Sequence, residues 1–260
     1  MDRRFIAANA AAALVLCFGL FIFPEDVAQG QTSELHVMVS DGMKTVVEEV
    51  TPQIERATGR KLVAQFDSSK NLRDKIQSGE PFDAAIITAD VLDDLIRKGK
   101  VTAGSRADIS RTGIGLGVRA GAPKPDISTP EALKKTLLSV KSISFNPTGA
   151  SSAHTREIFA NLGITDAVKS KLVLDAEAGR PQMNVAAGKV ELVISLVPEI
   201  EFFPGVDLVG PMPAELQSYI NFAGGVATNA HDAGAAKALL QFITSPGIAP
   251  VLKSKGMEAR

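Results

Sequence analysis

Small polar residues occur repeatedly where an apolar segment gives way to a helical pattern. In FDSSKN, residues 66–71, the apolar run KLVAQF ends at Phe66 and an amphipathic pattern begins near Asn71. Equivalent turns occur at residues 39–44 (VSDGMK), 145–153 (FNPTGASSA) and 176–182 (AEAGRPQ). The first N–H groups of a helix lack intrahelical acceptors and carry the positive end of the dipole, so such turns can bind an anion. One turn of this kind is usually an ordinary helix cap, whereas four of them favour a binding site.

Four serines and one arginine in these turns are the leading candidates for ligand contacts. Ser68 and Ser69 form one half of an expected anion clamp, and Ser151 and Ser152 form the other half. Arg180 stands at the start of a predicted helix. Its guanidinium group could bind a carboxylate through two hydrogen bonds, and a solvent-exposed arginine is the alternative.

Catalytic chemistry finds no support in the sequence. It contains no G-x-S-x-G turn and no phosphate-binding loop, and Cys17 is its only cysteine. The histidines His36, His154 and His231 are too far apart in the chain to suggest metal-ligand spacing. We therefore predict a protein that is not an enzyme, with no catalytic residues, no cofactor and no protein-ligated metal ion.

The turns are set in an alternation of short apolar segments and helical patterns. Apolar segments at 34–40, 61–66 and 82–89 are each followed by a helical pattern, and the alternation resumes from residue 128 to residue 196. Such alternation predicts an α/β fold with parallel strands and crossover helices. In a parallel sheet ligands bind beyond the carboxyl ends of the strands, which is where the polar turns lie.

Two glycine-rich, strand-like segments, 111–121 and 218–229, divide the chain into two predicted lobes. Lobe 1 is expected to comprise residues 31–112 and 225–260, and lobe 2 residues 113–224, each with a largely parallel sheet flanked by helices. Two crossing segments of this kind form a hinge, so the cleft between the lobes can open and close.

The N-terminus is typical of an export signal. Arg3 and Arg4 precede the apolar run IAANAAAALVLCFGLFIF, and small residues follow before residue 31. This pattern predicts a cleaved signal peptide over residues 1–30 and a periplasmic protein, with an uncleaved membrane anchor as the alternative. The formal net charge of −1 and the lack of a basic stripe argue against a nucleic-acid partner.

The chain resembles the periplasmic molybdate-binding proteins of ABC importers and their wider solute-binding family over residues 34–256. The most specific part of the resemblance is the run F-x-S-S-x-x-L, then I-x-x-G-x-P-x-D, then Ala-Asp. In this sequence these positions are Phe66, Ser68, Ser69, Leu72, Ile76, Gly79, Pro81, Asp83, Ala89 and Asp90.

The resemblance implies a two-lobed periplasmic-binding-protein fold of the second type, a molybdate-like or tungstate-like oxyanion in the cleft, and an ABC permease as partner of a monomer. In that family neutral donors hold the oxyanion. The matching positions are Gly42 and Ser69 for hydroxyls, Ser152 and either Ala178 or Gly179 for backbone amides, and Leu196 for a tyrosine. Gly42 lacks a hydroxyl and Leu196 lacks any donor, so two of these positions depart from the family pattern. The neighbouring Met43 is a further candidate for the cleft wall.

Asp41 and Asp67 stand where the resembling proteins usually have alanine. A carboxylate about 4 Å from an anion would repel it by roughly 4 kcal/mol at an intermediate dielectric constant. The two aspartates could instead cap their own helices, pair with Lys70 or Arg180, or contact hydroxyl or amine groups of a ligand.

Two ligand classes therefore stay open: an oxyanion held at Ser69 and Ser152, or a small organic acid or polar metabolite bound through Arg180. A periplasmic sensor with the same cleft is an alternative to a transport component.

Overall fold

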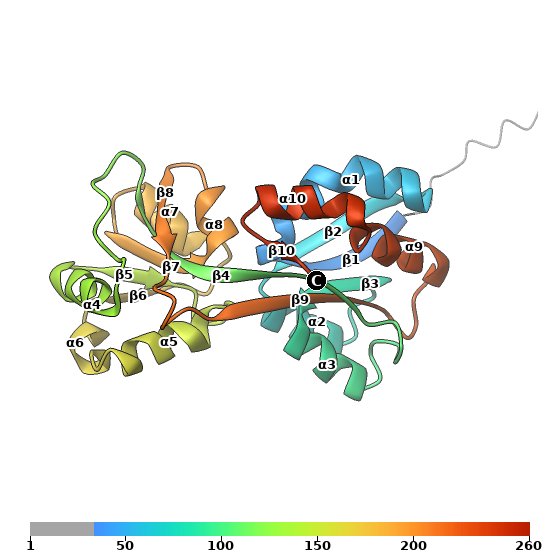
Figure 1. The fold of residues 1–260 in the computed structure, drawn as a ribbon. Coiled ribbons are helices and arrows are strands. Elements are labelled where there is room, and N and C mark those ends of the chain that lie inside the picture. Colours follow the sequence, from blue (N-terminus) through green and yellow to red (C-terminus); the bar gives the residue numbers. More distant parts are fainter. Residues whose placement is uncertain (1–33) are drawn as a thin grey trace, which may run out of the picture. The chain divides into compact units, whose positions relative to one another are not determined.

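The computed structural model describes residues 34–260, and the predicted signal peptide lies outside them. The chain begins with three strand–helix units, as the sequence predicts (Figure 1). These are β1 (Glu34–Ser40), α1 (Lys44–Thr58), β2 (Lys61–Asp67), α2 (Ser69–Gln77), β3 (Ala84–Thr88) and α3 (Ala89–Arg97), with a short 3-10 turn, η1 (Asp41–Met43), between β1 and α1.

The three strands form a parallel set because each is followed by a helix that crosses back over the sheet. β1 lies between β2 and β3 and pairs with both in parallel. The helix α1 buries Val46, Val47, Val50 and Ile54 on one face, and Gly59 ends it in the left-handed conformation at φ 65°. The carboxyl ends of β1 and β2 therefore meet at one edge of the sheet.

A second set of elements follows the long strand β4 (Ala107–Arg119). It comprises α4 (Pro130–Ser139), β5 (Ile143–Phe145), α5 (Ser152–Asn161), α6 (Thr165–Lys169), β6 (Leu172–Leu174), α7 (Arg180–Ala186), β7 (Leu192–Leu196), α8 (Val197–Glu201) and β8 (Val206–Pro211). The strands β5, β6 and β7 are again parallel neighbours, and β7 and β8 pair with β4 in antiparallel fashion. The sequence analysis did not predict α8 or β8.

The chain then returns through β9 (Tyr219–Val226) to the first set of elements. It ends in α9 (Ala233–Ile243), a short 3-10 turn, η2 (Pro246–Ile248), α10 (Ala249–Ser254) and β10 (Glu258–Ala259). We call β1 to β3 with α1 to α3, α9 and α10 the first lobe, and α4 to α8 with β5 to β8 the second lobe.

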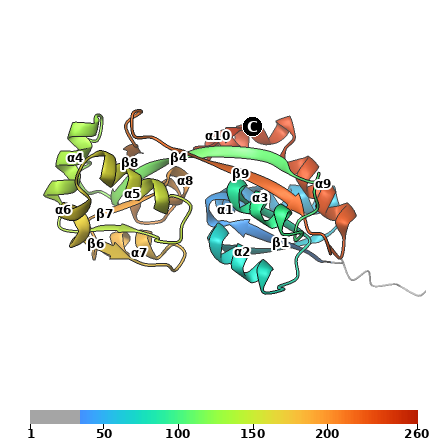
Figure 2. The same ribbon diagram turned by 90° about the horizontal axis from the view of Figure 1, so that it is seen from below.

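Two antiparallel strands, β4 and β9, run between the lobes (Figure 2). β9 pairs with β3 of the first lobe, and β4 pairs with β7 and β8 of the second. The strand order is thus continuous, β2-β1-β3-β9-β4-β7-β5-β6. The mixed α/β fold predicted from the sequence is confirmed, with its two parallel sets joined through β4.

Apolar packing holds the helix that opens at the FDSSKN turn. Leu72 and Ile76 of α2 are buried in one cluster with Leu92 and Leu95 of α3 and Ile87 of β3. Burial of each such side chain contributes roughly 1.5–3 kcal/mol. The first turn of α2 is therefore held firmly beside the end of β1.

Within residues 34–260 no single helix is long and apolar enough to span a membrane. Only α9 together with Pro246–Ser254 meets the length and composition as a pair, and this pair is bent by 57°.

Candidate functional site

A cavity of about 360 Å³ lies at the carboxyl ends of strands from both lobes. The ends of β1, β2, β5 and β7 each contribute residues to its wall, the arrangement expected for a ligand site in a parallel sheet. The first lobe contributes Ser40, Asp41, Lys44, Thr45, Glu48 and Ser68. The second contributes Asn146, Gly149, Ala150, Ala178, Gly179, Gln182, Met183, Ser195, Pro198, Glu199, Phe202, Phe203 and Pro204.

Ser68 lies on the cavity wall as the cap of α2. Its hydroxyl accepts a hydrogen bond from the Asn71 N–H at 3.2 Å. Asp67, just before it, accepts from the Ser68 N–H at 2.7 Å, from Asn71 Nδ2 at 2.8 Å and from Lys75 Nζ at 2.9 Å. Burial opposes the charge on Asp67, but these three bonds outweigh it and hold the pKa of this carboxyl below its ordinary value. Asp67 thus caps its own helix, and its cation is Lys75, not Lys70 or Arg180.

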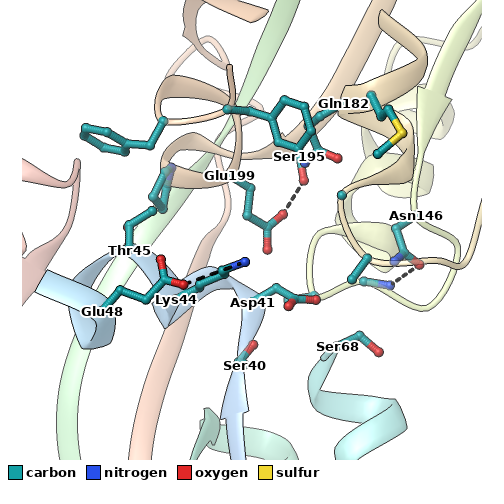
Figure 3. Close-up of a pocket in the computed structure, with 18 of the residues that line it drawn as sticks. Ser40, Asp41, Lys44, Thr45, Glu48, Ser68, Asn146, Gln182, Ser195 and Glu199 are labelled. Carbon is teal, nitrogen blue, oxygen red and sulfur yellow. Dashed lines mark hydrogen bonds and ion pairs between the residues drawn. The ribbon is translucent and has the colours of Figure 1, made fainter. Parts of the chain in front are cut away.

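Asp41 follows β1 and faces the cavity from the first lobe (Figure 3). Burial, and then the neighbouring charge of Asp67, raise the pKa of Asp41 to about 6, while Lys44 and Lys75 act in the opposite direction. Among the hydrogen bonds within residues 34–260, none involves the Asp41 carboxyl. This group is therefore available to a ligand.

Glu199 of α8 extends toward the first lobe from the other side of the cavity (Figure 3). Its carboxylate accepts a hydrogen bond from the Ser195 hydroxyl. Burial raises the pKa of Glu199 to about 7, and the charge of Asp41 acts in the same direction. The sequence analysis missed Glu199, although Pro198 at the start of a helix directly after a buried strand was a usable signal.

Two buried polar atoms of cavity-wall residues have no hydrogen-bond partner within residues 34–260. They are Thr45 Oγ1 in the first lobe and Gln182 Oε1 in the second. Gln182 is only 4% exposed, so water does not reach it freely. Buried polar groups are normally paired, so both atoms are suited to accept or donate a hydrogen bond from a bound molecule.

Ser69 is buried behind the wall and does not line the cavity. Its hydroxyl donates to Ser40 Oγ at 3.0 Å and accepts from the Thr88 N–H at 3.0 Å. Ser69 thereby ties the ends of β1 and β3 to the start of α2. Its neighbour in this network, Ser40, is the hydroxyl that reaches the cavity.

Ser151 and Ser152 are also buried away from the cavity wall. The Ser152 hydroxyl donates to the Pro147 carbonyl at 2.7 Å and accepts from Arg156. The Ser151 carbonyl accepts from the Thr155 hydroxyl at 2.8 Å. The same turn reaches the cavity through Asn146, Gly149 and Ala150 instead.

The remaining predicted residues likewise include one that lines the cavity and several that do not. Gly179 lines the cavity, whereas Gly42, Met43 and Leu196 are buried in the core beside it. Arg180 does not line the cavity: its guanidinium binds Glu177, with Nε 2.9 Å from that carboxylate. Of the ten predicted residues, the structure thus brings Asp41, Ser68 and Gly179 together around one cavity.

The wall offers hydroxyls, two side-chain amides, three carboxyl groups and one ammonium group, Lys44, together with an apolar surface. Within residues 34–260 no group of three or more histidine or acidic side chains is placed to hold a metal ion. The arrangement suits reversible binding of a small molecule by hydrogen bonds and charge.

Known proteins resemble this chain over most of its length. An aconitate isomerase of Pseudomonas sp. is 28% identical over 239 residues, which cover 89% of this chain and 90% of the isomerase. The molybdate-binding protein ModA of Azotobacter vinelandii is 28% identical over 232 residues, covering 87% of this chain and 90% of ModA. The structure of the periplasmic molybdate-binding protein from Azotobacter vinelandii superimposes with a TM-score of 0.73 at 17% identity, over 86% of this chain and 98% of that one.

The structural likeness shows a shared fold, since identity at this level carries no information on the ligand. The family model described as "bacterial extracellular solute-binding protein" matches residues 35–258, nearly the whole of the described chain, with its two lobes and the cavity between them. The chain belongs to the bacterial extracellular solute-binding protein family.

Proposed function

We propose that the protein is the periplasmic ligand-binding component of an ABC importer, acting as a monomer, and that it captures a small organic solute in the cavity between its lobes. The observation that carries the proposal is the convergence of polar groups from four strand ends of both lobes on one cavity. A solute held there contacts both lobes at once, so binding favours the closed form. A closed form is what a permease can recognise.

The charges on the wall favour an organic solute over an oxyanion. Asp41, Glu48 and Glu199 face the cavity with Lys44 as the single cation. A dianion about 4 Å from an ionised carboxylate would be repelled by several kcal/mol. The hydroxyls of Ser69 and Ser152 are engaged in bonds within the protein. A cavity of about 360 Å³ also falls in the range of small-molecule pockets.

A molybdate-like oxyanion is the second candidate, because a molybdate-binding protein is among the relatives. Such an ion would use the hydroxyls of Ser40 and Ser68 and backbone amides of the surrounding turns. It would require Asp41 and Glu199 to be protonated, which their raised pKa values permit below about pH 6.

We further propose that binding occurs without turnover, although one relative is named an isomerase. Aconitate carries three carboxylates, and Asp41, Glu48 and Glu199 would oppose them with only Lys44 in support. Incubation with aconitate, followed by NMR, tests this point. A change of isomer that depends on the protein would show an enzyme.

The solute itself can be identified by retrieval. Purified protein, residues 31–260, is mixed with a small-molecule extract of the source cells, washed and heat-denatured, and the released molecules are identified by mass spectrometry. Ala178→Trp places an indole ring on the cavity wall, at an exposed position that folding tolerates. Ala176→Trp, on the same loop but outside the wall, is the matched control.

We expect one solute to be retained by the wild type and by Ala176→Trp but lost by Ala178→Trp. Loss of uptake of that solute in cells lacking the gene would then establish import. Retention of nothing, or equal retention by all three proteins, would contradict the proposed function. Retention of molybdate alone would establish the second candidate.

A further inference from the structure

The cavity wall carries more carboxyl groups than cationic groups. Lys44 Nζ lies 3.8 Å from Glu48 Oε1, so the opposite charges of these two wall residues largely cancel. Among residues 34–260 neither Asp41 nor Glu199 forms a salt bridge: Glu199 accepts from the Ser195 hydroxyl, and Lys75 is paired with Asp67. A neutral or anionic solute would leave both carboxyl groups without a cationic partner.

Gln182, which also lines the cavity, supplies a third acceptor. Its Oε1 is buried and has no hydrogen-bond partner within residues 34–260. This carbonyl oxygen comes from α7 of the second lobe, whereas Asp41 comes from the first lobe. An ammonium group has three N–H donors and no acceptor, which matches a wall of carboxylates and one amide oxygen.

Part of the wall is apolar. Phe203, Pro204 and Met183 line the cavity on the side of the second lobe. Such a surface suits the hydrocarbon stem of a small molecule, because burial of CH₂ groups away from water is favourable.

From these contacts we infer that the solute is an organic cation, a small amine whose ammonium group binds Asp41 and Glu199 and whose hydrocarbon stem lies on the apolar wall. This inference rests on the proposed function and specifies the ligand of the same cavity. Charge-assisted hydrogen bonds to both lobes would then hold the closed form.

Four probes with different charge test the inference. Three share a four-carbon backbone: 1,4-diaminobutane with two ammonium groups, 1,4-butanediol with two hydroxyls, and succinate with two carboxylates. Molybdate is the fourth. Isothermal titration calorimetry at pH 7.5 measures their affinities for the wild type, Asp41→Asn, Glu199→Gln and Gln182→Leu. Glu215→Gln, at an exposed position outside the cavity, is the control.

We expect the diamine to bind at least tenfold more tightly than the diol, and succinate and molybdate to bind more weakly still. Asp41→Asn and Glu199→Gln should each lower the affinity for the diamine at least tenfold, Gln182→Leu should lower it several-fold, and Glu215→Gln should leave it unchanged. Circular dichroism confirms that each variant is folded, and the wild-type series decides the question even where a variant fails to fold.

A preference for succinate or molybdate, or the lack of any preference for the diamine over the diol, overturns the inference. An effect of Glu215→Gln as large as that of the two wall carboxyls would also overturn it. The further inference can fail while the proposed function holds. If the retrieval experiment yields a neutral or anionic solute that Ala178→Trp does not retain, solute capture stands and only the cationic ligand is refuted.

Discussion

Gly42 and Leu196 touch each other across the two lobes. A Cβ atom on Gly42 would lie 2.8 Å from Leu196 Cδ1 and 2.6 Å from Phe222 Cζ, and Leu196 is fully buried. These are the two positions at which the sequence departs from the resembling family, whose pattern has a hydroxyl and a tyrosine there. Here the two departures complement each other sterically, because the lack of a side chain on Gly42 makes room for Leu196. An apolar contact occupies the place where the resembling family has two donors.

Gly42→Ser is therefore expected to destabilise the protein, not to create an anion donor. The new side chain would overlap Phe222 and Leu196 in a packed core, which typically costs about 1–3 kcal/mol. Urea unfolding should show this loss, and oxyanion affinity should not rise. In a Leu196→Ala background the same substitution should cost less, because one of the two overlaps is removed.

The control for this prediction is Gly210→Ala in β8. A Cβ atom on Gly210 would meet Ile127 Cδ1 at 3.8 Å, an ordinary contact, so stability should change little. If Gly42→Ser proved as stable as the wild type and bound molybdate more tightly, the packing argument would be wrong.

Ser69→Ala is expected to lower stability more than ligand affinity. The substitution leaves the buried Thr88 N–H without its acceptor and removes the donor to Ser40. An unpaired buried group of this kind costs roughly 1–3 kcal/mol. Chemical unfolding measures the stability, and titration with the retrieved solute measures the affinity.

Ser78→Ala is the matched control, since the Ser78 hydroxyl donates to the Lys75 carbonyl at an exposed position directly after the same helix. It should change neither quantity by much. The opposite pattern, a tenfold loss of affinity for Ser69→Ala with unchanged stability, would place Ser69 in contact with the ligand.

Much of the fold followed from local sequence patterns. The strand–helix alternation from residue 34 to residue 99 and the glycine-rich segments at 111–121 and 218–229 correspond to observed elements. These patterns reflect burial and turn chemistry within a few residues, which a single sequence records directly. The helix α8 escaped notice because it has only five residues, Val197–Glu201.

The position of the cavity was predictable, but the direction of each side chain was not. Strand ends and polar turns indicated where a ligand site would form. Whether Asp67 faces a ligand or caps α2 depends on Lys75 and Asn71, and whether Arg180 faces the cavity depends on Glu177. The direction of such a side chain depends on which hydrogen-bond or ion-pair partner lies close to it in space. The sequence pattern of the turn does not show which partner that is.

The buried carboxyl of Glu199 should give the protein a distinctive dependence of stability on pH. Burial raises its pKa from an ordinary value of 4.5 to about 7. Between these two values the folded protein keeps a proton that the unfolded chain has released, so the free energy of unfolding falls as pH rises through this window. The slope from one such group is at most about 1.4 kcal/mol per pH unit. Glu199→Gln cannot titrate, although its amide oxygen can still accept from the Ser195 hydroxyl.

We therefore expect Glu199→Gln to match the wild type in stability near pH 5 and to exceed it near pH 8. Urea unfolding at intervals between these values measures the difference, and Glu215→Gln, exposed and outside the cavity, should follow the wild type throughout. Because the comparison is between two proteins at each pH, the titration of Asp41 and Asp67 largely cancels. Parallel curves for the wild type and Glu199→Gln would mean that the Glu199 carboxyl keeps its ordinary pKa in the folded protein and is ionised at neutral pH. In that case the second lobe would present a full negative charge to the cavity even without a ligand.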